Sequence, residues 1–126
     1  MDRNVPLGRM FGIRTVAIGN GTARARMRFH TDVTRAGGTV SGPALMALAD
    51  VALFAALLGS IGEVEMAVTT SLNTNFLRRP GPADVIAVAR IFKLGKRLAV
   101  GECALFSEGD DEMVAHVTGT YSIPPG

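Results

Sequence analysis

The sequence predicts an α+β fold in which a curved antiparallel sheet of about six strands wraps around one long central helix. Residues 44–58 are rich in Ala, Leu and Met and lack Gly and Pro, which favours a helix, and they are apolar nearly all round, as in a helix surrounded by protein. Strand-like runs lie on both sides of this segment. Because the links between consecutive strand-like runs are too short for a crossover helix, we expect an antiparallel meander.

The chain opens with a predicted hairpin. Residues 13–18 and 22–29 favour strands, and the second run alternates apolar residues with polar ones, most of them arginines. The Gly-Asn-Gly turn at 19–21 tolerates positive φ angles and is a strong hairpin signal. Residues 30–41 then form a polar loop that leads to the helix.

The two ends of the helix carry local signals. Ser41 and Gly42 are acceptable N-terminal caps, and Pro43 suits the first turn, where its missing N–H does no harm. Free backbone N–H groups should therefore point out of this end of the helix. Gly59 is expected to end the helix as its C-terminal cap.

Further strands are expected after the helix, at residues 67–77, 84–94, 98–107 and 113–123. Turn signals rich in Gly, Pro and charged residues separate them, at residues 78–82, 95–97 and 108–111. The predicted order is therefore two strands, the helix and four strands.

The composition describes one domain over residues 1–126, and its 48% hydrophobic share leaves enough apolar surface for a subunit interface. A net charge of +2 is too small to imply nucleic-acid binding. The lone Cys103 excludes an intramolecular disulfide and favours a reducing compartment, so we expect a cytoplasmic protein. Residues 44–58 are shorter than the roughly 20 residues that span a bilayer, so no membrane segment is expected.

Asp50 is the first candidate for chemistry, because a carboxylate in the middle of a buried helix is costly unless it is paired, hydrogen-bonded or partly hydrated. It could fix the helix in place through a bond to a nearby hydroxyl or backbone N–H. It could instead act as a general base or a nucleophile. The residues alone leave both interpretations open.

The turn before the helix is the second candidate. Free N–H groups at a helix N-terminus can polarise a carbonyl oxygen, although an ordinary capped helix start also explains this turn. Asp50 lies two turns further on, roughly 10 to 12 Å away by the helical rise. A substrate would therefore lie along the helix, unless Asp50 comes from a second copy of the chain.

Other side chains give weaker signals. The basic residues Arg78, Arg79, Lys93, Lys96 and Arg97 cluster at strand ends and could bind the phosphates of a nucleotide-bearing substrate. His30 and His116 stand alone in the sequence, so neither a metal site nor a cofactor is expected.

Three motifs resemble those of the PaaI-like hotdog-fold acyl-CoA thioesterases. They are GTVSGPALMALADVA at 38–52, AVTTSLNTNFLRRP at 67–80 and KLGKRLAV at 93–100. The resemblance extends over about residues 13–123. It implies a hotdog fold, acyl-CoA hydrolysis and active sites shared across a dimer interface, in a dimer or a dimer of dimers (a homotetramer).

Carried over to this chain, the resemblance makes Asp50 the catalytic carboxylate and the Gly42 backbone N–H the group that polarises the thioester carbonyl. Thr69 matches a position whose hydroxyl helps to place the attacking water. The chain departs from the family pattern where Ser41 replaces the usual turn histidine, and where Arg35 matches an upstream Asn. Pro43 also replaces a glycine and so removes one donor.

The resulting hypothesis is hydrolysis of an acyl-CoA to a free acid and CoA, without a cofactor. The expected substrate-binding residues are Ser41, Arg35, Arg78, Arg79, Lys96 and Arg97. The alternative is a non-catalytic acyl-CoA-binding module of the same fold. A hydratase would need an Asp and a His a few residues apart on the loop and helix, and neither His30 nor His116 is placed in that way.

Overall fold

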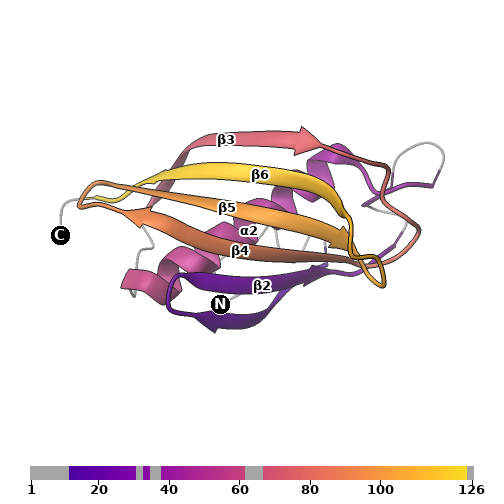
Figure 1. The fold of residues 1–126 in the computed structure, drawn as a ribbon, viewed down its shortest axis with the longest axis horizontal. Coiled ribbons are helices and arrows are strands. Elements are labelled where there is room, and N and C mark those ends of the chain that lie inside the picture. Colours follow the sequence, from indigo (N-terminus) through magenta and orange to yellow (C-terminus); the bar gives the residue numbers. More distant parts are fainter. Residues whose placement is uncertain (1–11, 31–32, 35–37, 62–66, 125–126) are drawn as a thin grey trace.

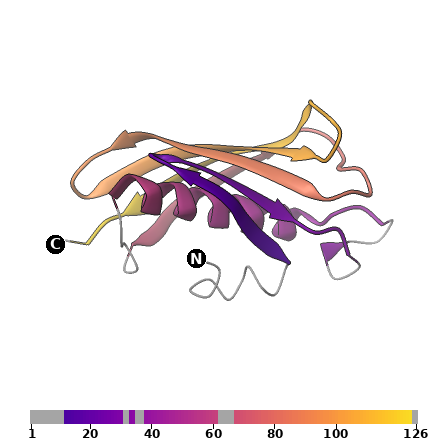
Figure 2. The same cartoon turned by 90° about the horizontal axis from the view of Figure 1, so that it is seen from below.

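The computed structural model describes residues 12–30, 33–34, 38–61 and 67–124, and over these residues it confirms the expected fold. A six-stranded antiparallel sheet curves over one side of a long helix (Figures 1 and 2). The elements are β1 (Ile13–Gly19), β2 (Thr22–Met27), α2 (Gly42–Ile61), β3 (Val68–Phe76), β4 (Val85–Leu94), β5 (Leu98–Ser107) and β6 (Met113–Ser122). The strand order in the sheet is β1-β2-β4-β5-β6-β3.

The predicted meander is correct for β1–β2 and for β4–β5–β6 but wrong for β3. This strand pairs with β6 at the edge of the sheet and not with β4, its successor in the sequence. The link between β3 and β4, residues 77–84, therefore passes two strands, a distance of about 14 Å. The link contains bends at residues 78, 82 and 83, and the Ala83 N–H donates to the Gly81 carbonyl at 2.9 Å, whereas the sequence prediction treated the whole link as one turn between neighbouring strands.

Helix α2 is longer than expected and covers 20 residues. Gly59 lies inside it and does not cap it, because the helix continues to Ile61. A Cβ at Gly59 would lie only 2.1 Å from the backbone oxygen of Gly19. The missing side chain therefore lets the β1–β2 hairpin pack directly against the last turns of the helix.

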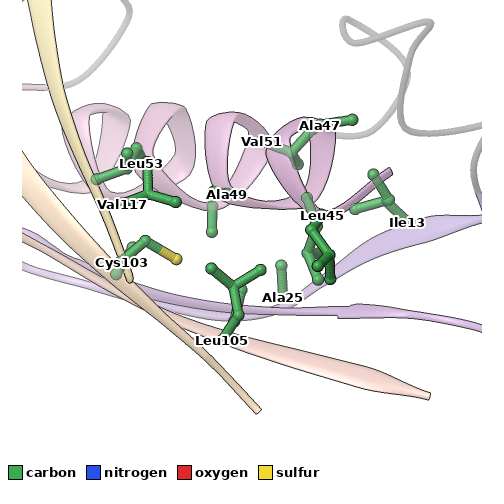
Figure 3. Packing of buried hydrophobic residues seen from close by; sticks show 14 of the residues in the cluster. Ile13, Ala25, Leu45, Ala47, Ala49, Val51, Leu53, Cys103, Leu105 and Val117 are labelled. Carbon is green, nitrogen blue, oxygen red and sulfur yellow. The ribbon is translucent and has the colours of Figure 1, made fainter. Parts of the chain in front are cut away.

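By length and mean hydropathy, 2.1, helix α2 would suffice to cross a membrane, although residues 44–58 alone were expected to be too short. Most of this apolar surface is buried against the sheet in the structure. Figure 3 shows Leu45, Ala49 and Leu53 of the helix facing the residues that the strands contribute to the core. The helix is thus the centre of the hydrophobic core.

Two glycines set how closely the helix approaches the middle of the sheet. Gly101 of β5 and Gly119 of β6 are directly opposed in the sheet register. The methyl carbons of Leu53 lie 2.9 Å and 3.0 Å from the points where Cβ atoms on these two glycines would stand. Leu53 therefore fits into a notch in the sheet, which we call the Gly101–Gly119 notch. A residue larger than glycine at either position would fill this notch.

One stripe of the helix is only partly covered within the chain, and Asp50 in this stripe contacts β3 and β6 through Thr69 and Tyr121. Met46 is exposed, and Asp50, Phe54 and Leu58 are half-buried, at the spacing of one helical face. The helix is central and largely buried, as expected, but this stripe is open in the described part of the chain. Asp50 stands in the middle of an apolar surface that is open on one side.

Candidate active site

The first turn of α2 leaves one backbone donor free. The Ser41 hydroxyl accepts a hydrogen bond from the Ala44 N–H at 3.2 Å, and the Ser41 carbonyl accepts one from Leu45 at 3.1 Å. Pro43 has no N–H. Among the described residues, nothing accepts a hydrogen bond from the Gly42 N–H, so this group is available to a ligand. Ser41 acts here as the helix cap, and its contact with substrate stays a prediction.

Gly42 opens onto a groove of about 460 Å³ at the end of β3. A Cβ at Gly42 would lie 3.3 Å from the ring of Phe76, so the absence of a side chain leaves space beneath this ring. The groove is lined by Thr39, Val40, Gly42, Leu45, Phe76, Leu77, Arg78, Arg79 and Pro80. It combines an apolar wall, a free N–H and two guanidinium groups, which suits a ligand with a carbonyl and an anionic part.

The Asp50 carboxylate is held through one of its two oxygens. The Thr69 hydroxyl lies 3.1 Å from Oδ1, and the Tyr121 hydroxyl lies 2.6 Å from the same atom. Among the described residues, no donor contacts Oδ2, and no cation forms an ion pair with this carboxylate. Asp50 therefore keeps one oxygen free on the open face of the helix.

Tyr121 is a site residue that the sequence prediction missed. Its side chain is 1% exposed, and its hydroxyl reaches Asp50 across 71 positions of the chain. Burial, together with the neighbouring Asp50 carboxylate, raises the pKa of Tyr121 far above its usual range, so the phenol stays protonated. The available signal was the alternation of β6, which turns the chain's single tyrosine inward, where its hydroxyl needs a partner.

The predicted basic residues fall into two groups. Arg78 and Arg79 line the Gly42 groove, whereas Lys96 and Arg97 lie in the β4–β5 turn at the other end of the sheet. Arg78 forms ion pairs with Glu112 at 2.6 Å and Asp110 at 3.6 Å, whereas Arg79 is exposed and has no ion pair among the described residues. Arg35 lies outside the described residues.

Cys103 is a core residue. It is fully buried, and burial raises the pKa of its thiol to about 12. Since the thiolate is the nucleophilic form, this cysteine is inert at neutral pH. Asp50 is therefore the stronger candidate for chemistry.

The two parts of the expected site are separate within one chain. Gly42 and Asp50 are eight positions apart on α2, which corresponds to about 12 Å along the helix axis. Gly42 contacts the end of β3 at Phe76, and Asp50 contacts its beginning at Thr69. One chain therefore carries two half-sites at opposite ends of the same edge strand.

Comparisons with known proteins identify the family. The model of the thioesterase superfamily matches residues 37–114, a range that includes Gly42, Asp50 and Thr69. A crystal structure of a thioesterase candidate from Silicibacter sp. TM1040 is 39% identical, with a TM-score of 0.85, and the match covers 98% of this chain and 86% of that one.

Two further relatives are similar. The phenylacetic acid degradation protein PaaI from Thermus thermophilus is 30% identical, with a TM-score of 0.83, over 94% of this chain and 99% of that one. An esterase candidate from Thermoplasma acidophilum is 28% identical over 106 residues, which are 84% of this chain and 79% of the relative. The fold, the two half-sites and these matches together show that this chain is a PaaI-like hotdog protein and belongs to the thioesterase superfamily.

Proposed function

We propose that this protein hydrolyses acyl-CoA thioesters at sites that combine Asp50 of one subunit with Gly42 of another. The observation that carries the proposal is the Asp50 carboxylate, which is anchored through Oδ1 and has Oδ2 free on the open face of the helix. A carboxylate held in this way can remove a proton from water or attack a carbonyl directly.

The reaction needs no cofactor. Water activated by Asp50 attacks the thioester carbonyl carbon, and the Gly42 N–H stabilises the negative charge that develops on the oxygen. The C–S bond then breaks, and the CoA sulfur takes up the proton that Asp50 removed. If Asp50 attacks first, it displaces CoA as a thiolate and forms a mixed anhydride, and in a second step water cleaves this anhydride, which releases the acid, restores the Asp50 carboxylate and supplies the proton that the thiolate takes up. Both routes give a free acid and CoA.

The arrangement of β3 supports a site shared between subunits. This strand is at the sheet edge, and its apolar residues Val68 and Phe76 are 60% and 54% exposed. An exposed edge strand can pair with another chain. If two copies pair through antiparallel β3 strands, the Thr69 end of one copy meets the Phe76 end of the other. Since Asp50 lies at the first end and Gly42 at the second, this pairing completes two sites.

The proposal extends to a dimer or a dimer of dimers as the functional unit. The open stripe of α2 and the exposed apolar residues of β3 are the surfaces that a second copy would cover. A cytoplasmic location also stays a prediction, for which the single buried Cys103 is the supporting observation.

A panel of aryl, short-chain and long-chain acyl-CoAs tests the proposal, with release of free thiol as the readout. We expect steady turnover of at least one class, with the amount of thiol released far exceeding the amount of enzyme. Binding of these thioesters without thiol release would contradict hydrolysis and favour the acyl-CoA-binding module. Light scattering gives the oligomeric state, and a monomer would contradict the shared site.

Arg79→Ala should raise KM for acyl-CoA by about tenfold with little change in kcat, because this exposed guanidinium has no ion pair among the described residues and can bind a CoA phosphate. The measurement compares acyl-CoA with the same acyl group on N-acetylcysteamine, which has no phosphate. Only the KM for acyl-CoA should change.

Arg24→Ala is the matched control for Arg79→Ala. Arg24 is also exposed and without an ion pair among the described residues, but it lies on the outer face of the sheet. An equal rise in KM for both variants would indicate a general charge effect and would contradict phosphate binding by Arg79.

A further inference from the structure

Tyr121 and Thr69 hold Asp50 from a pair of directly opposed positions. Thr69 of β3 and Tyr121 of β6 are register partners in the sheet, and both side chains face α2. The two hydroxyls therefore come from neighbouring strands joined by the ladder, and not from loops. Asp50 lies over this pair and is anchored by the sheet.

The hydrogen-bond geometry assigns different roles to the two carboxylate oxygens. An ionised carboxylate can only accept hydrogen bonds, so both hydroxyls donate to Oδ1. Each hydroxyl has one proton. The Tyr121 hydroxyl also lies 3.3 Å from the Asp50 backbone oxygen. Its contact with Oδ1 is much shorter, 2.6 Å, so the hydroxyl proton is donated to Oδ1.

The χ2 torsion of an aspartate is broad, so an unanchored carboxylate rotates and exchanges its two oxygens. The Tyr121 ring cannot move in the same way, since its side chain is buried among the core residues and close to Gly119. The phenol therefore fixes the plane of the carboxylate.

We propose that Tyr121 is a positioning residue of the active site, which holds Asp50 through Oδ1 so that Oδ2 is the oxygen that reacts. This inference rests on the proposed hydrolysis by Asp50 and adds to it a residue that does not touch the substrate. Hydrolysis could proceed without it, but with a carboxylate that is poorly oriented.

Few titratable groups contribute to the behaviour of Asp50. The elements packed around it present Tyr121 and Cys103, and both remain protonated at neutral pH because burial raises the pKa of each side chain. No Lys, Arg or His side chain in the described ranges forms an ion pair with this carboxylate. Among the described residues, the hydroxyls of Tyr121 and Thr69 are therefore the groups that hold this carboxylate.

Tyr121→Phe should lower kcat about tenfold and leave KM within about twofold of the wild type, because the ring and its packing are kept and only the donor is lost. The measurement is steady-state thiol release over a range of substrate concentrations, which separates kcat from KM.

Val117→Ala is the control for stability. Val117 is fully buried on the same face of β6, but it has no contact that holds the carboxylate. We expect a lower melting temperature with kcat and KM close to those of the wild type. If Tyr121→Phe and Val117→Ala change activity only in proportion to their stability, or if Tyr121→Phe has the wild-type kcat, the positioning role is wrong.

A double variant separates this inference from the proposed function. Combining Tyr121→Phe with Asp50→Asn should lower the residual rate no further than Asp50→Asn does, because Tyr121 acts through Asp50. A further loss of rate in the double variant would overturn the inference, whereas full activity of Asp50→Asn would overturn the proposed function.

Discussion

Asp50→Asn should lower kcat for thioester hydrolysis by about a hundredfold or more, the usual contribution of a general base or nucleophile. Asparagine keeps the size of the side chain, and its carbonyl oxygen can still accept the hydrogen bonds of Tyr121 and Thr69. Its amide group then stands where Oδ2 was, and an amide can neither accept the proton of a water molecule nor attack a thioester. The fold should therefore survive while the chemistry is lost.

The measurement is steady-state thiol release, with circular dichroism to verify the fold. Asp111→Asn is the matched control, since Asp111 is exposed in the β5–β6 turn and has no ion pair among the described residues. Wild-type rates are expected for this control. Wild-type rates for Asp50→Asn would mean that another group carries the reaction.

The Asp50→Asn variant also tests whether the site is shared between subunits. Gly42→Pro removes the N–H that no described residue accepts and adds a ring close to Phe76, and proline is well tolerated in the first turn of a helix. If the sites are shared, each mixed dimer of Asp50→Asn and Gly42→Pro chains contains one intact site. Random mixing should then restore about a quarter of the wild-type activity, because half of the dimers are mixed and each has one of two sites. If mixing restores no activity, Asp50 and Gly42 of each site come from the same chain.

Gly59→Ala should destabilise the protein by about 3 kcal/mol or more, at the upper end of the cost of overpacking a core. The new Cβ would lie 2.1 Å from the Gly19 backbone oxygen and 2.7 Å from a methyl group of Ile18. Neither neighbour is the end of a flexible side chain, so the hairpin and the helix must separate. Thermal unfolding should show a midpoint lower by about 10 °C.

Gly81→Ala is the control for this prediction. The nearest atom to a Cβ at Gly81 is 4.0 Å away, and the Gly81 N–H that bonds to Ser107 is retained in alanine. The melting temperature should stay within about 2 °C of the wild type. If the melting temperature of Gly59→Ala is as close to the wild type as that of Gly81→Ala, the hairpin can move aside at little cost in stability.

The features of the fold that were predicted correctly depend on local signals in the sequence. The Gly-Asn-Gly turn, the Ser41 cap and the alternation of the strands depend on residues that are close in the chain, and the structure confirms them. Pairing partners depend on distant residues. Nothing within residues 67–77 distinguishes β6 from β4 as a neighbour, so the simplest connection was assumed and proved wrong.

The same distinction applies to the site. Asp50 was recognisable because a charge in an apolar helix is unusual within its own segment. Tyr121 could not be recognised as its partner, since the contact exists only after β6 has paired with β3 and α2 has packed against both. A glycine at position 59 could either cap the helix or allow another segment to approach it closely. Only the position of the β1–β2 hairpin distinguishes these two roles.

The Gly101–Gly119 notch also connects the core to the chemistry. Leu53, which fits into the notch, is one helical turn from Asp50, and Gly119 is two residues from Tyr121. The depth of the notch therefore determines the distance between the helix that carries the acceptor and the strand that carries the donor. A methyl group added at Gly119 would raise the helix and lengthen the 2.6 Å contact. Two residues with no side chains thus act as a spacer that sets the position of the Asp50 carboxylate from within the core.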